Sequence, residues 1–290
     1  MSVTTTGYLM WPPQQRHASN RGKGGSVVEL GIKDKVVLIS GSYRGTGAGT
    51  ARVFAQEGGL VAVHGHESGQ ADEVVSDIRT NNGNAVAVHG DLGTSEGAEH
   101  VVSQVEEAYG PVDVLVNNYG APGSTKWTDL AEVWKQGWET NVLTGIRLTQ
   151  RVLPSMRERG WGRIIFIGTV GTERPSERNP DYYGSKGSLP VVVRSLAKEL
   201  RGSGVTANLV SPGMIATSEV REMLQRRAAR HDIHGWEEVQ RWALDNSMPN
   251  LTDRIPDPED IGRYVVFVAS EAAWHLTGMD FKTDGGAIDA

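Results

Sequence analysis

The sequence predicts one α/β domain, in which a doubly wound parallel sheet of about seven strands carries helices on both faces. From Lys33 onward, short β-branched runs alternate with helix-length segments, as in repeated strand-helix-strand units. A glycine-rich turn follows the first of these runs directly. The length of 290 residues suits one core, because single cores remain workable up to roughly 250–300 residues. We therefore expect a single domain over residues 31–290.

The strands are predicted from short apolar runs that turn residues bound on each side. They are Val36–Ile39, Leu60–Val63, Ala85–His89, Val112–Val116, Arg163–Ile167, Thr206–Val210 and Met279–Lys282. The helices between them are predicted at Thr46–Gln56, Ala71–Thr80, Glu96–Ala108, Val142–Arg157, Ser185–Arg201 and Pro258–Ser270. In an open sheet of this kind, ligands bind beyond the carboxyl ends of the strands, so each loop that follows a strand is a candidate site.

Two segments depart from the regular alternation. Residues 1–30 mix polar residues, Pro and Gly without an apolar period, which predicts a flexible N-terminal extension; the alternative is that Trp11 and Pro12 dock on a neighbouring subunit. Residues 217–253 are charge-rich and helix-forming and contain Trp236 and Trp242, which predicts a small helical lid over the substrate. The alternative for this segment is a surface helical hairpin whose tryptophans pack inward.

Composition and charge exclude several classes of protein. The net charge of -6 argues against nucleic-acid binding, which needs a basic face, and favours small-molecule partners. With 0 Cys, the chain has no disulfide framework, no thiolate nucleophile and no cysteine-ligated zinc. No apolar run approaches the roughly 18–20 residues that cross a bilayer, so we expect no membrane association and a cytoplasmic location. Because no His, Asp and Glu residues show convincing metal-ligand spacing, we also expect no metal.

The first predicted strand runs into the turn Ser40-Gly41-Ser42-Tyr43-Arg44-Gly45-Thr46-Gly47, and a helix follows. Glycines let the backbone turn sharply and approach a pyrophosphate, while the helix N-terminus supplies free N–H groups and positive potential. This context predicts a dinucleotide site, and a tight structural turn is the alternative.

The end of the second predicted strand bears on the choice between NAD and NADP. An acidic residue there would hold the ribose 2′-hydroxyl of NAD and repel a 2′-phosphate. Here the chain has His64-Gly65-His66, with no carboxylate before Glu67. The missing carboxylate and the presence of Arg44 in the glycine turn favour NADP, while NAD remains possible.

A series of motifs in order resembles those of the classical short-chain dehydrogenase/reductase family, over Lys33 to Gly286. The glycine turn is similar to the family's Thr-Gly-x-x-x-Gly-x-Gly, and Asn117-Asn118-Tyr119-Gly120 to its Asn-Asn-Ala-Gly. The other matches are Asp91-Leu92, Asn141, the Tyr-x-x-x-Lys formed by Tyr182 and Lys186, and Pro212-Gly213 with Thr217, followed by Asp284-Gly285-Gly286.

The resemblance implies a Rossmann-like fold, a nicotinamide cofactor and the interconversion of a ketone and a secondary alcohol. It implies that Tyr182 is the acid/base, with Lys186, Thr169 and Asn141 as its catalytic partners, and that the chain forms a homo-oligomer, a tetramer or dimer. The cofactor-binding residues it implies are Gly41, Ser42, Tyr43, Arg44, Gly45, Thr46, Gly47, His66, Asp91, Leu92, Asn118, Tyr182, Lys186, Pro212, Gly213, Ile215 and Thr217.

The chemistry of the Tyr182 and Lys186 pair follows from helix geometry. Residues four apart share one helix face, and a nearby ammonium lowers the pKa of a phenol. We therefore expect Lys186 to ease proton transfer by Tyr182, while the Thr169 hydroxyl holds the substrate oxygen and Asn141 holds a water.

Two residues depart from the family pattern: Thr169 stands for its serine, and Tyr119 places bulk near the cofactor. They motivate an alternative, a catalytically weak cofactor-sensing or scaffold member of the same fold. A nucleotide-sugar epimerase or dehydratase is a third reading, which the glycine spacing does not fit. Trp127, Trp134 and Trp138 precede Asn141 and belong to the core, to an interface or to the pocket.

Overall fold

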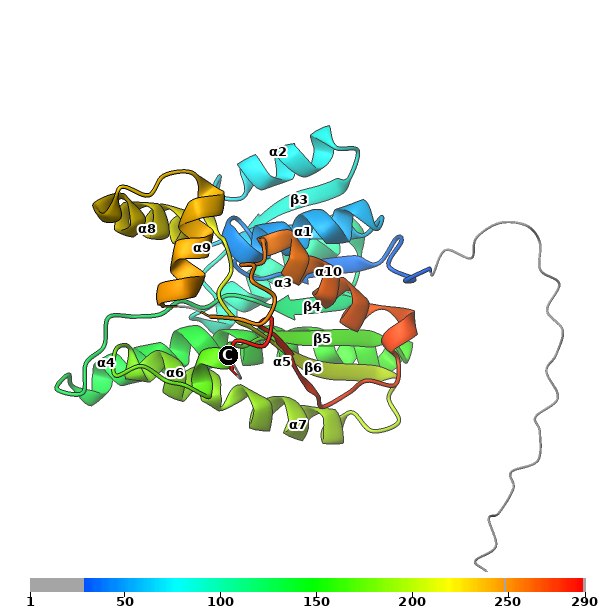
Figure 1. Ribbon diagram of the computed structural model, residues 1–290. Coiled ribbons are helices and arrows are strands. Elements are labelled where there is room, and N and C mark those ends of the chain that lie inside the picture. The colour runs from blue at the N-terminus through cyan, green and yellow to red at the C-terminus, as the bar shows by residue number, and fades with distance from the viewer. Residues whose placement is uncertain (1–28, 248, 289–290) are drawn as a thin grey trace, which may run out of the picture.

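The computed structural model describes residues 29–247 and 249–288. Seven strands form one fully parallel sheet in the order β3-β2-β1-β4-β5-β6-β7 (Figure 1). The fold class predicted from the sequence is confirmed. The strands are β1 (Val36–Ile39), β2 (Leu60–Gly65), β3 (Asn84–His89), β4 (Val114–Asn117), β5 (Gly162–Ile167), β6 (Val205–Pro212) and β7 (Asp280–Thr283).

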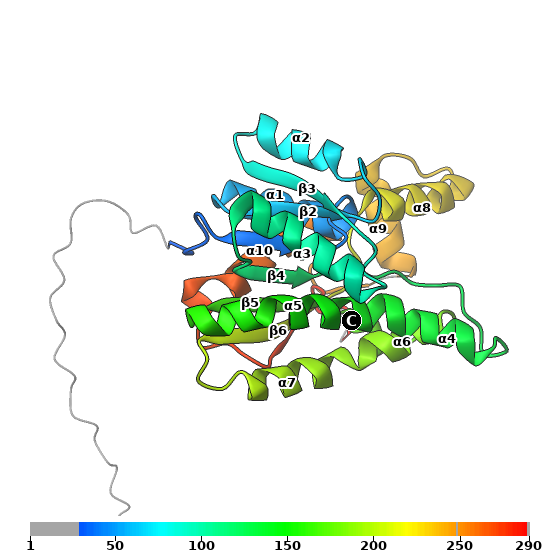
Figure 2. The ribbon, with the colours of Figure 1, turned by 180° about the vertical axis from the view of Figure 1, so that it is seen from behind.

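Two hydrophobic cores lie on the two faces of the sheet. Alternate side chains of β1 divide between them: Val37 and Ile39 belong to the first core, and Val36 and Leu38 to the second. The helices α1 (Gly45–Gln56), α2 (Asp72–Thr80) and α10 (Pro258–Ala269) cover the first face. The helices α3 (Ser95–Tyr109), α5 (Thr144–Arg159) and α7 (Leu189–Glu199) cover the second face, seen in front in Figure 2.

Two predicted helices differ from those observed. The helix predicted at Ser185–Arg201 is divided into α6 (Pro180–Gly187) and α7, because Pro190 in the first turn of α7 has no N–H to continue the helix. The helix predicted from Val142 begins earlier. It comprises α4 (Ala131–Trp138), the π-helical turn η1 (Glu139–Leu143) and α5.

The segment predicted as a lid lies beyond the carboxyl ends of the strands (Figure 1). It contains α8 (Ser218–Ala228), the 3₁₀ turn η3 (Ala229–His231) and α9 (Trp236–Asn246), which share a small third core. Trp236 and Trp242 are partly buried and pack against this core. The tryptophans therefore pack inward, as in the hairpin alternative. The remaining short 3₁₀ elements are η2 (Val170–Thr172) and η4 (Glu271–Ala273).

Leu30 packs against the first core, and its carbonyl accepts a hydrogen bond from Glu271 N at 3.0 Å. Most of the predicted extension, with Trp11 and Pro12, lies outside the described residues. Within the described residues, no helix is both long and apolar enough to span a membrane.

Candidate active site

The glycine turn lies between β1 and α1 at the carboxyl edge of the sheet. Gly41 and Gly45 have φ angles of 62° and 56°, in the left-handed region that glycine tolerates best. A Cβ added to Gly47 would lie 2.6 Å from Asn118 Nδ2 and 2.7 Å from Gly41 O, so only glycine fits there. The first helical hydrogen bond runs from Ala48 N to the Arg44 carbonyl at 3.2 Å, so the amides before it are open to an anion.

A network of hydrogen bonds ties this turn to the end of β4. Asn118 Nδ2 donates to the carbonyls of Ser40 at 2.9 Å and Gly41 at 3.1 Å. The Ser40 hydroxyl oxygen accepts from the amides of Asn118 at 3.0 Å and Tyr119 at 2.9 Å. The side-chain amide of Asn118 thus holds the glycine turn in place from the end of β4.

The other turn residues divide into buried and exposed ones. Ser42 is fully buried and donates its hydroxyl to Ile39 O at 2.7 Å, so its side chain shapes the turn. Tyr43 is partly buried against the first core, with the guanidinium of Arg44 5.3 Å from its ring centroid. Thr46 O accepts from the hydroxyl of Thr50 at 2.8 Å. Arg44 itself pairs with Glu219 of α8, Nη1 to Oε1, at 2.8 Å.

The residues predicted around the adenosine lie at the ends of β2 and β3. His66 Nδ1 is 3.9 Å from Asp91 Oδ1, and both side chains are about half exposed. Leu92 is only 1% exposed and belongs to the second core, so its side chain is a packing residue.

Tyr182 and Lys186 lie on the short helix α6, where Pro180 occupies the first turn. Burial, with a smaller contribution from Tyr183, raises the pKa of Tyr182 to about 12 against the opposing effect of the Thr169 side chain. The expected lowering by Lys186 is absent in this structure. The physical reason is that desolvation of the phenol dominates, while the Lys186 amine donates to Ile167 O at 2.8 Å.

The Lys186 amine is fully buried, and burial lowers its pKa to about 8. A Cβ added to Gly120 would lie 3.0 Å from Lys186 Nζ and 2.7 Å from Asn141 Oδ1. Gly120 therefore lies next to both the Lys186 amine and the Asn141 amide, and these two side chains are close to each other.

Asn141 is 4% exposed and sits in the π-helical turn η1, a feature that is frequent at functional sites. Its Oδ1 accepts from Ala121 N at 3.0 Å, and its Nδ2 donates to Gly137 O at 3.0 Å. Both polar atoms of the side chain are thus engaged by backbone, which fixes its orientation.

The loop after β6 meets the glycine turn from the other side. Pro212 ends β6, and Gly213 N donates to Thr283 O at 3.4 Å. Ile215 is partly buried against the first core. Thr217 accepts from Val220 N at 3.4 Å as the N-cap of α8, and its methyl lies 3.6 Å from a Cβ added to Gly45. The base of the predicted lid therefore touches the phosphate-binding turn.

These elements define a class: an α/β protein with a dinucleotide cradle beside a Tyr, Lys, Thr and Asn cluster. The left-handed glycines Gly41 and Gly45 and the amides before Ala48 at the start of α1 fit a cofactor pyrophosphate.

Comparisons with known proteins agree with this class. The short chain dehydrogenase family matches residues 35–228. The uncharacterized oxidoreductase YvaG of Bacillus subtilis (strain 168) is 31% identical over 264 residues, spanning 90% of this chain and 98% of that protein. L-Sorbose reductase from Gluconobacter frateurii, solved with NADPH and L-sorbose, has a TM-score of 0.82 at 28% identity, covering 91% of this chain and 100% of that one. A 3-oxoacyl (acyl-carrier-protein) reductase from Agrobacterium tumefaciens C58, solved with NADP, has a TM-score of 0.77 at 28% identity, covering 89% and 96%.

The chain belongs to the classical short-chain dehydrogenase/reductase family of oxidoreductases.

Sequence reasoning missed two residues at this site. His64 is 1% exposed and accepts a hydrogen bond from Gly41 N, and Glu219 binds Arg44. The signal for His64 was a polar residue inside the buried run of β2. Tyr119, expected to add bulk near the cofactor, lies against Gly41, with Cδ2 3.0 Å from a Cβ added there.

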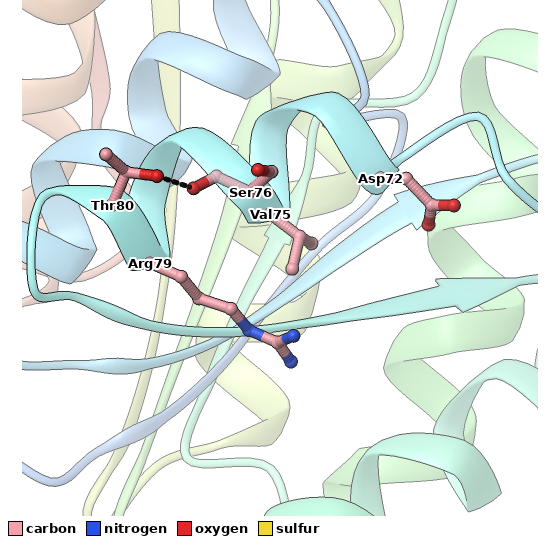
Figure 3. Close-up of a pocket in the computed structure, with 5 residues that line it drawn as sticks. All are labelled: Asp72, Val75, Ser76, Arg79 and Thr80. Atoms are coloured by element: carbon pink, nitrogen blue, oxygen red, sulfur yellow. Dashed lines mark hydrogen bonds between the residues drawn. The ribbon is translucent and has the colours of Figure 1, made fainter.

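A surface hollow lies away from this cluster, on the outside of α2 (Figure 3). Its lining residues are Asp72, Val75, Ser76, Arg79 and Thr80, all from that single helix. The Thr80 hydroxyl there donates to Ser76 O at 2.8 Å, a bond within the helix. None of the predicted site residues lines it.

Proposed function

We propose that this protein is an NADP-preferring oxidoreductase that interconverts a ketone and a secondary alcohol, with Tyr182 as the acid/base. The observation that supports it best is that α6 carries Tyr182 together with Lys186, whose buried amine lies with the Asn141 amide beside Gly120. These groups lie at the same sheet edge as the glycine turn, where a bound cofactor and substrate would meet.

When bound, the nicotinamide supplies or accepts the hydride. In the reduction, Tyr182 donates its phenolic proton to the carbonyl oxygen, which becomes the alcohol hydroxyl; in the oxidation the proton returns. Thr169, whose side chain lowers the pKa of Tyr182, holds the substrate oxygen through its hydroxyl. A pKa near 12 keeps Tyr182 protonated at neutral pH, so the proton for the reduction is in place.

Lys186 and Asn141 support the reaction without donating the proton to the substrate themselves. With a pKa of about 8, the buried amine carries a proton in most molecules at neutral pH. Because Lys186 does not lower the pKa of the phenol here, its ammonium would instead hold the ribose of a bound nicotinamide cofactor. Asn141 lies in a π-helical turn, where backbone carbonyls depart from the usual helical hydrogen-bond pattern. These carbonyls can hold a water that resupplies the proton to Tyr182.

The preference for NADP is supported by Arg44 and by the absence of a carboxylate at Gly65. Arg44 is 62% exposed in its side chain, within reach of solvent and ligand. Both similar structures carry NADPH or NADP. The dissociation constant for NADPH should be clearly below that for NADH, and Arg44→Ala should narrow the difference; equal affinities would contradict the preference.

The proposed function is tested by following NADPH absorbance in the purified protein with a panel of carbonyl compounds. The panel should include ketoses such as L-sorbose and a 3-oxoacyl thioester, the substrate types that the similar reductases are named for. Oxidation of NADPH that depends on one class of ketone and disappears in Tyr182→Phe supports the proposal. No turnover with any carbonyl or alcohol, despite tight cofactor binding, would support the cofactor-sensing alternative.

The raised pKa of Tyr182 is the observation that favours that second candidate, because a phenolate is then costly to form. The same absorbance screen separates the two candidates.

We also propose a cytoplasmic homo-oligomer. Trp127 and Leu130 are each 74% exposed and Trp138 is 44% exposed, on or beside α4. Such large exposed apolar side chains suit burial against a second copy. Light scattering after size exclusion should give a mass that is a multiple of 31.4 kDa, and Trp127→Ser should shift it toward the monomer.

A further inference from the structure

His64 is a buried histidine of β2 that connects three strand ends. Gly41 N, in the turn after β1, donates to His64 Nδ1 at 3.0 Å. On the other side of the ring, His64 Nε2 is 3.0 Å from Gly90 O, in the loop after β3. The side chain is 1% exposed, so neither contact is shared with bulk water.

The two backbone partners fix the state of the ring. Gly41 N–H can only donate and Gly90 C=O can only accept, so Nδ1 is the acceptor and Nε2 carries the proton. Desolvation lowers the pKa of His64 to about 4, against the opposing effect of the Gly90 bond, and the nearby His66 and His89 lower it further. The ring is therefore neutral at neutral pH, with one acceptor aimed at the glycine turn.

The backbone of His64 adds to the same connection. Its amide donates to Ser42 Oγ at 2.9 Å, and its carbonyl accepts from Ser42 N at 3.0 Å. Tyr119 packs edge-on to the imidazole, with ring centroids 6.1 Å apart. The turn is thus held from β2 by three hydrogen bonds, and one of them, from Gly41, depends on the identity of the side chain.

We propose that His64 is a positioning residue for the cofactor: its Nδ1 orients the Gly41 peptide and so presets the phosphate-binding turn. This inference rests on the proposed function, because it assigns the held turn to cofactor binding. A glycine with a left-handed φ has many alternative conformations, so a fixed partner for its amide reduces the cost of ordering the turn when a ligand binds. The bond to Gly90, in contrast, lies away from the turn, in the loop that precedes Asp91.

Two substitutions separate the two ring nitrogens. In His64→Asn, the amide oxygen can occupy the place of Nδ1 and keep the bond from Gly41, while the bond to Gly90 is lost. In His64→Gln, the longer side chain can place its NH₂ near Nε2 and keep the bond to Gly90, while the bond from Gly41 is lost. Each variant leaves one buried backbone group unpaired, so both should lose thermal stability to a similar degree.

The experiment measures the dissociation constant for NADPH in the purified full-length protein, together with the melting temperature. We expect His64→Gln to weaken NADPH binding by roughly tenfold, because the buried Gly41 N–H is then left without an acceptor. His64→Asn should stay within about threefold of the wild type. His100→Asn, on the exposed surface of α3, is the control for a histidine exchange.

A second readout needs no cofactor: amide hydrogen exchange in a peptide that contains Gly41. Exchange should accelerate in His64→Gln and stay slow in His64→Asn. If both variants weaken NADPH binding equally, or in proportion to their loss of melting temperature, His64 is only structural and the inference is wrong. Wild-type protein that binds neither NADPH nor NADH would instead overturn the proposed function, and this inference with it.

Discussion

Arg44 in the glycine turn and Glu219 in the first turn of α8 form an ion pair of 2.8 Å. The pair joins the phosphate-binding turn to the predicted lid. Arg44 also lowers the pKa of the Glu219 carboxyl, after the larger effect of a backbone hydrogen bond. A 2′-phosphate on the cofactor would compete with this carboxylate for the same guanidinium.

Glu219→Gln should therefore bind NADPH more tightly, while NADH binding stays unchanged. Both side chains are more than half exposed, so the gain is about two- to fivefold, as for a screened surface pair. The measurement is the dissociation constant of each cofactor at low and high salt. Glu222→Gln is the matched control, because Glu222 lies on the same helix and pairs with Arg226 instead. An unchanged NADPH constant in Glu219→Gln would show that Arg44 does not bind the 2′-phosphate.

Tyr182→Phe should reduce turnover by at least about 10²–10⁴-fold, the usual contribution of a positioned acid. Cofactor affinity should change by less than about twofold, because the ring and its packing remain. Tyr183→Phe is the control: its ring centroid lies 5.4 Å from that of Tyr182 and it also carries a hydroxyl. Undiminished turnover in Tyr182→Phe would end the proposed mechanism.

Thr169→Ala should lower kcat by about 10²-fold, the size seen when one donor to a developing oxyanion is removed. The Thr169 side chain lowers the pKa of Tyr182, so the alanine variant should also shift the limb where the oxidation rate rises with pH to higher pH. Thr169→Ser keeps the hydroxyl and should retain at least about a third of the activity. A serine variant as weak as the alanine variant would show that the methyl group, which restricts the rotamer, carries the effect.

The sequence predicted the strands closely because strands buried on both faces are continuous apolar runs, as in Val36–Ile39. Such runs are recognised without knowing which side chains face which side of the sheet. It predicted the cluster of Asn141, Tyr182 and Lys186 only through a family resemblance, since these residues are far apart along the chain. The π-helical turn at Glu139–Leu143 carries no local signal, because it depends on how Asn141 is held by Ala121 and Gly137.

The contacts of Arg44 and His64 show the same limit. Arg44 and Glu219 are 175 positions apart, and His64 reaches Gly41 and Gly90 across three strands. Neither partner follows from local periodicity. The pKa of Tyr182 was expected to fall beside Lys186, whereas burial raises it, because the depth of a side chain is a property of the packed fold.

Lys186→Met should abolish turnover and stabilise the fold at neutral pH. Burial lowers the pKa of Lys186 from 10.5 to about 8, which corresponds to roughly 3 kcal/mol of unfavourable free energy for the charged form. Below pH 8 the lysine is protonated in both the folded and the unfolded protein, so the full cost is present. Between pH 8 and 10.5 only the unfolded protein keeps the proton, so the stability of the wild type rises with pH in this window.

The stability advantage of Lys186→Met should therefore be largest near pH 7 and shrink as the pH rises from 8 to 10.5. Urea unfolding of both proteins at several pH values gives this difference directly. The hydrogen bond from Lys186 to Ile167 O offsets part of the cost, so the measured difference should be smaller than the full 3 kcal/mol, roughly half of it. A difference that does not change across this range would mean that the buried amine keeps an ordinary pKa, which would contradict the lowering by burial.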